Sequence, residues 1–426
     1  MPNPIGALFC HGLGCIWFSC ADGPAGGREE GLRLLFYSGS LGLGHVTRDL
    51  GLARQLRKEL PGASVDWLAA PPALEALKGA GEYVLPQAQR LLNLSHEAEC
   101  VAQGSRLNLT RYLSRVRQKW RLNAVIVGEV LTTTSYDCMI GDETYEVAAA
   151  RGYGRITRNL PFVMIYDFVG LETHSFNPIE RFGVWCSCKR WVKLFSADLS
   201  LFVGELEDVP DEPFGFLLPN RRKFARANYK FIGYMLPFSP GVPDRELTRS
   251  ELGYGPEPLI VCSIGGTSVG KQLLELCTTA WPLLRQRQST LRMVLVCGPR
   301  LDPDCVRAPE GITVLGYVAD LYRHFAAADL AIVLGGGSTT LELTALRRPF
   351  LYFPIEGHSE QEGCVSRRLA RHRAGERLTL SRTGPEQLAE RALAWLGREV
   401  DYEHIPTDGA RLGAEEIAGL LARRQP

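Results

Sequence analysis

Short apolar runs alternate with amphipathic stretches along the first half of the chain. Residues 32–38, LRLLFYS, have the continuous apolar character of a buried strand. The next segment, RDLGLARQLRKEL (48–60), repeats apolar residues at helical spacing, and Pro61-Gly62 ends that helix. Further strands are predicted at SVDWLA (64–69), NAVIVG (123–128), YDCMIGD (136–142), PFVMIYDFVG (161–170) and DLSLFVG (198–204).

The same alternation restarts after a stretch rich in proline and glycine. Residues 239–258, SPGVPDRELTRSELGYGPEP, have the composition of an interdomain linker. Strands that alternate with helices predict an α/β protein whose mostly parallel sheets are covered by helices on both faces. The apolar runs beyond the linker are LIVCSIGG (259–266), RMVLVCG (292–298), ITVLGY (312–317), LAIVLGGG (330–337) and PFLYFPI (349–355).

The length of 426 residues exceeds what one hydrophobic core usually supports, so two domains are expected. The first 31 residues contain an apolar stretch like that of a signal peptide, but they lack an early positive charge and a clean cleavage site. We therefore expect a disordered leader there. The predicted divisions are a leader (1–31), an acceptor-side α/β domain (32–235), a linker (236–256), a donor-side α/β domain (257–400) and a tail (401–426) ending in a short amphipathic helix.

Composition excludes several classes of protein. The net charge of +1 and the pI of about 7.5 lack the basic character typical of a nucleic-acid binder. No apolar run reaches the roughly 18 residues that a transmembrane helix needs. The 12 cysteines are scattered, and CSC at 186–188 lacks the spacing of a zinc site. These features indicate a cytoplasmic protein with reduced thiols and no metal centre.

Three glycine-rich loops follow predicted strands: GSLGLGH (39–45), IGGTSVG (264–270) and GGGSTT (335–340). In an open parallel sheet such loops lie at the carboxyl ends of strands, where helix N-termini offer free N–H groups to anions. A dinucleotide-binding dehydrogenase would need a third glycine where Thr47 stands and an acid where residues 69–71 are AAP. The pattern therefore argues against a nicotinamide cofactor, and no P-loop sequence is present.

The third loop and the segment that follows it carry groups suited to a diphosphate, a ribose and a sugar. We expect the glycine amides and the two hydroxyls to hold the diphosphate at a helix N-terminus. The Glu342 carboxylate could accept both hydroxyl protons of a ribose, and Glu360 with Gln361 could contact sugar hydroxyls. The full set is Gly336, Gly337, Ser338, Thr339, Glu342, Glu360 and Gln361.

In three segments the sequence resembles the nucleotide-sugar glycosyltransferases of the GT-B type: GLGHVTR (42–48), IGGTS (264–268) and GGGSTTLELTALRRPFLYFPIEGHSEQE (335–362). The likeness is to the group that contains the peptidoglycan N-acetylglucosaminyltransferase and the UDP- and antibiotic glycosyltransferases. In layout it extends over most of residues 32–400. It implies two facing Rossmann-like domains with mostly parallel sheets. Leu334 stands where many plant-type members have a phosphate-contacting histidine, and the peptidoglycan branch lacks that histidine as well.

The resemblance also implies roles for single residues. His45 would be the catalytic base, taking a proton from an acceptor hydroxyl as that hydroxyl attacks the anomeric carbon. Gly42 and Gly44 would let the backbone approach the diphosphate. In the second loop, the residues expected at the phosphate are Gly266, Thr267 and Ser268.

A carboxylate should orient His45 or balance its charge. Asp142 and Asp167 each follow a predicted strand, so either could face the same cleft as His45. Arg48 lies three residues after His45, where it could contact a phosphate or pair with Asp49 or another nearby acid.

The expected function is sugar transfer from a nucleoside diphosphate donor to an acceptor hydroxyl, without metal or cofactor; UDP follows from the resemblance alone. The acceptor could be lipid-linked or a small molecule. The basic amphipathic stretch RLNLTRYLSRVRQKWR (106–121) could bind an anionic membrane surface, or could be a solvated helix packed on the sheet. Alternatives on the same fold are a nucleotide-sugar hydrolase or epimerase, and a non-catalytic nucleotide-sugar-binding partner subunit.

Overall fold

A computed structural model describes most of the chain from residue 31 to residue 424. The described residues are 31–39, 43–93, 102–103, 106–107, 109–156, 159–172, 177–194, 197–238, 244–266, 268–358 and 360–424. The predicted leader up to residue 30 and the predicted site residues Gly42 and Thr267 lie outside them. So do the side chains of residues 106–114 in the basic stretch.

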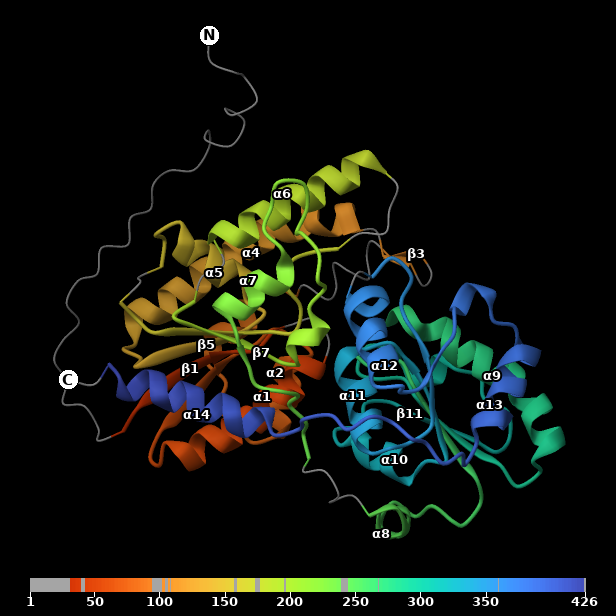
Figure 1. The fold of residues 1–426 in the computed structure, drawn as a ribbon. Coiled ribbons are helices and arrows are strands. Elements are labelled where there is room, and N and C mark those ends of the chain that lie inside the picture. Colours follow the sequence, from red (N-terminus) through yellow and green to blue (C-terminus); the bar gives the residue numbers. More distant parts are fainter. Residues whose placement is uncertain are drawn as a thin grey trace.

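The first half of the chain forms a six-stranded parallel sheet in the order β2-β1-β5-β6-β7-β8 (Figure 1). Its strands are β1 (Arg33–Tyr37), β2 (Ser64–Leu68), β5 (Cys138–Asp142), β6 (Phe162–Tyr166), β7 (Leu199–Phe202) and β8 (Lys230–Phe231). One face packs against α4 (Leu109–Thr133), α5 (Tyr145–Gly152), α6 (Pro178–Leu194) and α7 (Arg221–Asn228). The other packs against α1 (Gly44–Glu59), α2 (Ala73–Gly79) and α14 (Gly409–Ala422). A short antiparallel pair joins β3 (Ala102–Gln103) to β4 (Arg106–Leu107).

The second half repeats this architecture in the order β11-β10-β9-β12-β13-β14. Its strands are β9 (Leu259–Ser263), β10 (Arg292–Val296), β11 (Ile312–Leu315), β12 (Leu330–Leu334), β13 (Phe350–Phe353) and β14 (Glu376–Arg377), all parallel. Helices α9 (Lys271–Arg287) and α13 (Pro385–Trp395) cover one face. Helices α10 (Leu321–Ala327), α11 (Gly337–Ala345) and α12 (Ser366–Arg371) cover the other. The predicted α/β class with two parallel sheets is confirmed.

Short irregular helices complete the described elements. Single 3₁₀ turns occur at Pro86–Arg90, Leu206–Asp208, Ser268–Gly270, Pro303–Cys305 and Leu380–Arg382, and a π-helical turn at Glu360–Val365 leads into α12. Helix α8 (Arg245–Glu251) lies within the segment predicted as a linker, where the Asp244 side chain caps it by accepting from the Leu247 N–H.

The predicted strand at residues 123–128 is wrong, because this segment lies in the middle of α4. Val116, Val127 and Val130 are buried at helical spacing and extend one apolar face through it. No proline or glycine separates the run from the basic stretch before it, so the helix continues. Of the basic stretch, Val116 is buried and Trp120 packs against the core, which leaves that apolar face covered by protein.

The C-terminal segment returns to the first sheet (Figure 1). Helix α14 packs along α1, and Ile417 and Leu421 enter the same core as Leu52 and Leu56. Gly413 lies at this contact, where an added Cβ would be 3.3 Å from Leu52. The chain therefore crosses between the two α/β units twice, once before α8 and once before α14. Within the described residues, none of the helices has both the length and the apolar character needed to cross a bilayer.

Candidate functional site

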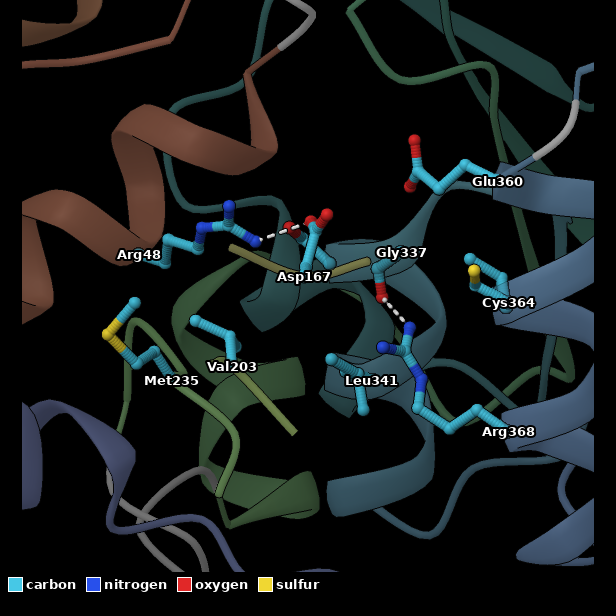
Figure 2. A pocket seen from close by; sticks show the side chains of 11 residues that line it. Arg48, Asp167, Val203, Met235, Gly337, Leu341, Glu360, Cys364 and Arg368 are labelled. Atoms are coloured by element: carbon cyan, nitrogen blue, oxygen red, sulfur yellow. Dashed lines mark hydrogen bonds and ion pairs between the residues drawn. The ribbon is translucent and has the colours of Figure 1, made fainter. Parts of the chain in front are cut away.

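Both sheets reverse their strand order next to the same cleft. In the first sheet the chain runs from β1 outward to β2 and then resumes on the other side of β1 at β5; β9 has the same position between β10 and β12. Ligands of open α/β sheets bind outside the carboxyl ends of the strands at such a reversal. A pocket there is lined from the first unit by Arg48, Asp167, Val203 and Met235, and from the second by Gly337, Ser338, Leu341, Glu360, Cys364, Val365 and Arg368 (Figure 2).

His45 and Asp142 form a hydrogen-bonded pair at this edge of the first sheet. His45 is the second residue of α1, Asp142 ends β5, and the distance from His45 Nδ1 to Asp142 Oδ2 is 3.0 Å. Burial would raise the pKa of the Asp142 carboxyl, but the neighbouring Arg48 and His45 lower it to about 2. The same nitrogen lies 2.9 Å from Arg48 Nη2, so Nδ1 faces both an acceptor and a donor. In the tautomer that donates Nδ1–H to the ionised Asp142, Nε2 is the nitrogen that can accept a proton.

Arg48 contacts two carboxylates as well as the His45 ring. Its Nε and Nη2 donate to the two oxygens of Asp142 at 2.8 and 2.6 Å, and its Nη1 donates to Asp167 Oδ2 at 2.7 Å. The residue is 5% exposed. Of the predicted alternatives, pairing with nearby acids is what the structure shows. The acids are Asp142 and Asp167 rather than Asp49, which instead accepts a hydrogen bond from Ser38.

Asp167 interacts with Arg48 and Glu143, which both lie beside His45. Burial alone would raise the pKa of the Asp167 carboxyl. The charge of Arg48 and a hydrogen bond from Glu143 outweigh burial and bring this pKa below its ordinary value, so Asp167 stays ionised. Burial and the proximity of Asp167 raise the pKa of Glu143 well above its ordinary value, so Glu143 holds the shared proton. Glu143 also has a φ of 51°, a left-handed conformation that is strained for a residue with a side chain.

The distal nitrogen of His45 lies near Glu143. The distance from Nε2 to Glu143 Oε2 is 3.8 Å, which is too long for a hydrogen bond. No closer side-chain partner of Nε2 is present among the residues that the structure describes.

The first and third glycine loops meet across the cleft. Gly336 caps α11 in an extended conformation, and Ser338 lies in the first turn of that helix. Gly44 opposes it so closely that an added Cβ would lie 2.4 Å from Ser338 Oγ. A side chain at position 44 would therefore displace Ser338 from the close approach of two helix N-termini. Thr339 lies in the same turn of α11 but does not line the pocket.

Glu342 is a buried acid without a partner. It lies one turn into α11, is 8% exposed, and is not among the residues that line the pocket, although its neighbour Leu341 is. Its carboxyl makes no hydrogen bond or ion pair with any described residue. Burial alone raises the pKa of the Glu342 carboxyl to about 8. A buried acid with no protein partner is costly to keep, and such groups mark candidate ligand sites.

Of the remaining residues predicted to bind the donor, one lines the pocket and the others that the structure describes do not. Glu360 lines the pocket, and burial and the nearby Asp167 raise the pKa of its carboxyl. Gln361 is occupied structurally, since its Oε1 accepts from the Ile355 N–H at 2.9 Å. Gly266 does not line the pocket, and the side chain of Ser268 lies outside the described part of the chain. Next to Gly266, an added Cβ at Gly298 would be 2.1 Å from the Gly265 carbonyl oxygen.

Several pocket residues have no counterpart in the sequence prediction. Met235 and Val203 supply apolar lining from the first unit, and Arg368 on α12 supplies a cation from the second. The segment SRRLARHR (366–373) directly follows the last predicted donor motif, and its density of basic residues is the signal that was available. Spacing alone does not say which of its arginines faces the pocket.

Comparison with known proteins agrees with this architecture. Residues 260–401 match the glycosyltransferase family 28 C-terminal domain. An uncharacterized glycosyltransferase of Methanosarcina mazei is 24% identical over 341 residues, covering 78% of this chain and 82% of the relative. The UDP-N-acetylglucosamine--N-acetylmuramyl-(pentapeptide) pyrophosphoryl-undecaprenol N-acetylglucosamine transferase of Carboxydothermus hydrogenoformans is 27% identical over 131 residues, 29% of this chain and 35% of that protein. The solved structure of the glycotransferase of kitacinnamycin has the same fold, with a TM-score of 0.59 at 15% identity over 94% of this chain and 100% of that one.

Proposed function

Because the chain is a glycosyltransferase of the GT-B fold, we propose that it transfers a sugar from a UDP-linked donor to an acceptor hydroxyl. The observation that carries the proposal is the close approach of two helix N-termini, that of α1 at Gly44 and that of α11 at Ser338. On one side His45 is held by Asp142, and on the other the N-terminus of α11 leads to the unpartnered Glu342. UDP as the nucleotide is supported by the name of the Carboxydothermus relative.

In the proposed reaction His45 Nε2 removes the proton of the acceptor hydroxyl. The hydroxyl oxygen attacks the anomeric carbon, the bond from that carbon to the diphosphate oxygen breaks, and the diphosphate keeps the electron pair. The ionised Asp142 stabilises the imidazolium that forms. The N–H groups and the positive end of the α11 dipole stabilise the charge on the departing diphosphate, a role that needs no metal ion.

Glu342 is proposed to bind the ribose of the nucleotide. Hydrogen bonds from both ribose hydroxyls favour the ionised form of this carboxyl and would supply the partners that the protein does not. Glu360 is proposed to contact the sugar from its position in the pocket lining. The acceptor enters from the first unit and is either lipid-linked or a small molecule.

Calorimetric titration with UDP, with TDP, GDP and CMP as competitors for the same site, tests the donor proposal. We expect UDP to bind most tightly and Glu342→Ala to weaken it about ten- to a hundredfold, since a charged hydrogen-bonding partner is lost. The control is Glu390→Ala, which removes an exposed acid from α13. Equal affinity in Glu342→Ala and the wild type would refute the assignment of Glu342.

A hydrolase of the same fold would use water in place of the acceptor. Incubation with UDP-sugars and no acceptor separates the two reactions, because a hydrolase releases free sugar at its full rate. We expect UDP release to remain slow until an acceptor is added. Rapid release of free sugar would favour the hydrolase instead.

A further inference from the structure

Arg368 occupies an unusual position among the basic residues of α12. It is 5% exposed and lines the pocket together with Gly337 and Ser338 at the start of α11 (Figure 2). Its Nη2 donates to the Gly337 carbonyl oxygen at 3.1 Å, and its guanidinium carbon lies 5.4 Å from the ring centre of Tyr234. Its Nε is buried and has no hydrogen-bond partner among the described residues.

The neighbouring arginines are neutralised by carboxylates, whereas Arg368 is not. Arg367 makes two hydrogen bonds of 2.9 Å to Glu172, and Arg371 donates to Asp208 at 2.7 Å. Arg48, on the opposite wall of the pocket, is held by two aspartates. Within the described residues, Arg368 makes no ion pair. Its charge acts on the Glu360 carboxyl of the same pocket, but burial and Asp167 raise the pKa of that carboxyl. A buried cation that lacks a counter-ion is costly, and an anionic ligand would remove that cost.

Two independent features therefore point to an anion at the same place. One is the N-terminus of the nine-residue helix α11, whose first N–H groups are open to a ligand. The other is the unpaired guanidinium beside it. We propose that Arg368 binds the diphosphate of the nucleotide-sugar and stabilises the charge that collects on it when the bond to the sugar breaks.

This inference rests on the proposed function and adds one residue to it. When the bond between the anomeric carbon and the diphosphate oxygen breaks, the electron pair stays on that oxygen, while the proton of the acceptor hydroxyl passes to His45. The planar guanidinium can donate to two phosphate oxygens at once, which an ammonium cannot do in the same geometry. Arg368 therefore contributes to binding of the diphosphate leaving group and does not contact the nucleoside.

The test compares ligands that differ only in phosphate. Uridine, UMP and UDP are titrated calorimetrically into the wild type, Arg368→Gln, Arg368→Lys and the control Arg373→Gln. Arg373 is 59% exposed and pairs with Glu403, so its replacement removes a nearby positive charge outside the pocket. We expect Arg368→Gln to weaken UDP about ten- to a hundredfold, with uridine changed less than about twofold and Arg368→Lys intermediate.

The outcomes separate this inference from the function on which it rests. If the wild type binds no UDP, the proposed function fails and Arg368 with it. If the wild type binds UDP but Arg368→Gln binds it equally well, only the role of Arg368 is overturned. Equal weakening of uridine and UDP would overturn it too, because it would show that Arg368 only supports the loop at Gly337. Arg368→Lys, which keeps the charge, gives the same comparison if Arg368→Gln does not fold.

Discussion

Replacing Glu342 by glutamine should change how the stability of the protein depends on pH. The folded carboxyl has a pKa of about 8, raised by burial from an ordinary value of 4.5. The folded protein therefore keeps a proton between these pH values that the unfolded chain has lost. Stability from this group is fully present below pH 4.5 and is lost as the pH rises toward 8. Over the whole range the loss is about 5 kcal/mol.

The assay is urea unfolding at pH 5 and at pH 8.5, for the wild type, Glu342→Gln and the exposed control Glu390→Gln. Glutamine has nearly the same shape and does not ionise, so the variant lacks this pH dependence. We expect the free energy of unfolding of the wild type to fall by about 4 kcal/mol more than that of Glu342→Gln between the two pH values. Other titrating groups contribute equally to both proteins and cancel. If Glu342→Gln and the wild type change in parallel, Glu342 is not a buried, unpartnered acid, and the argument for a ligand there fails.

Three further substitutions test the other side of the cleft. His45→Ala should lower the transfer rate at least about a hundredfold with little change in the unfolding midpoint, because general base catalysis is lost; unchanged activity would refute the role of His45. Arg48→Met should lower the free energy of unfolding by about 3–5 kcal/mol, measured in urea, since two buried aspartates lose their counter-ion; a near-neutral effect would contradict the ion pairs described. Gly44→Ala should cost about 1–3 kcal/mol in the same assay, because its Cβ would clash with Ser338, whereas Gly79→Ala, which meets no atom within 4 Å, should cost nothing.

The strands could be predicted well from the sequence because their signal is local. A strand such as LAIVL (330–334) is buried on both faces and therefore apolar throughout. The exception at residues 123–128 shows the limit of that signal. Buried helices and buried strands both contain short apolar runs, and only the continuation of helical spacing from Val116 to Val130 separates them.

Part of the site could be predicted for a topological reason. Asp142 ends β5 and Asp167 directly follows β6, so their approach to a residue after β1 follows from the strand order. Which acid contacts His45 depends on side-chain geometry that sequence spacing does not contain. Gln361 illustrates the same limit, because its amide supports the backbone at Ile355.

Arg368 could not be predicted because its role depends on the lack of a carboxylate partner of the kind that its neighbours have. It is one of several arginines in a short basic segment, and only the carboxylates opposite Arg367 and Arg371 distinguish it. Those carboxylates come from the first unit, far away in the sequence. An ion pair between residues of the two units leaves no pattern in the sequence around either residue.

A crystal structure of the chain with UDP tests the central claim most directly. The account predicts the ribose hydroxyls at the Glu342 carboxylate and the diphosphate at the N-terminus of α11, beside Arg368 and across from His45. A structure in which the nucleotide lies elsewhere and Glu342 is still unpartnered would contradict the account. One such place is the contact of Gly265 with Gly298.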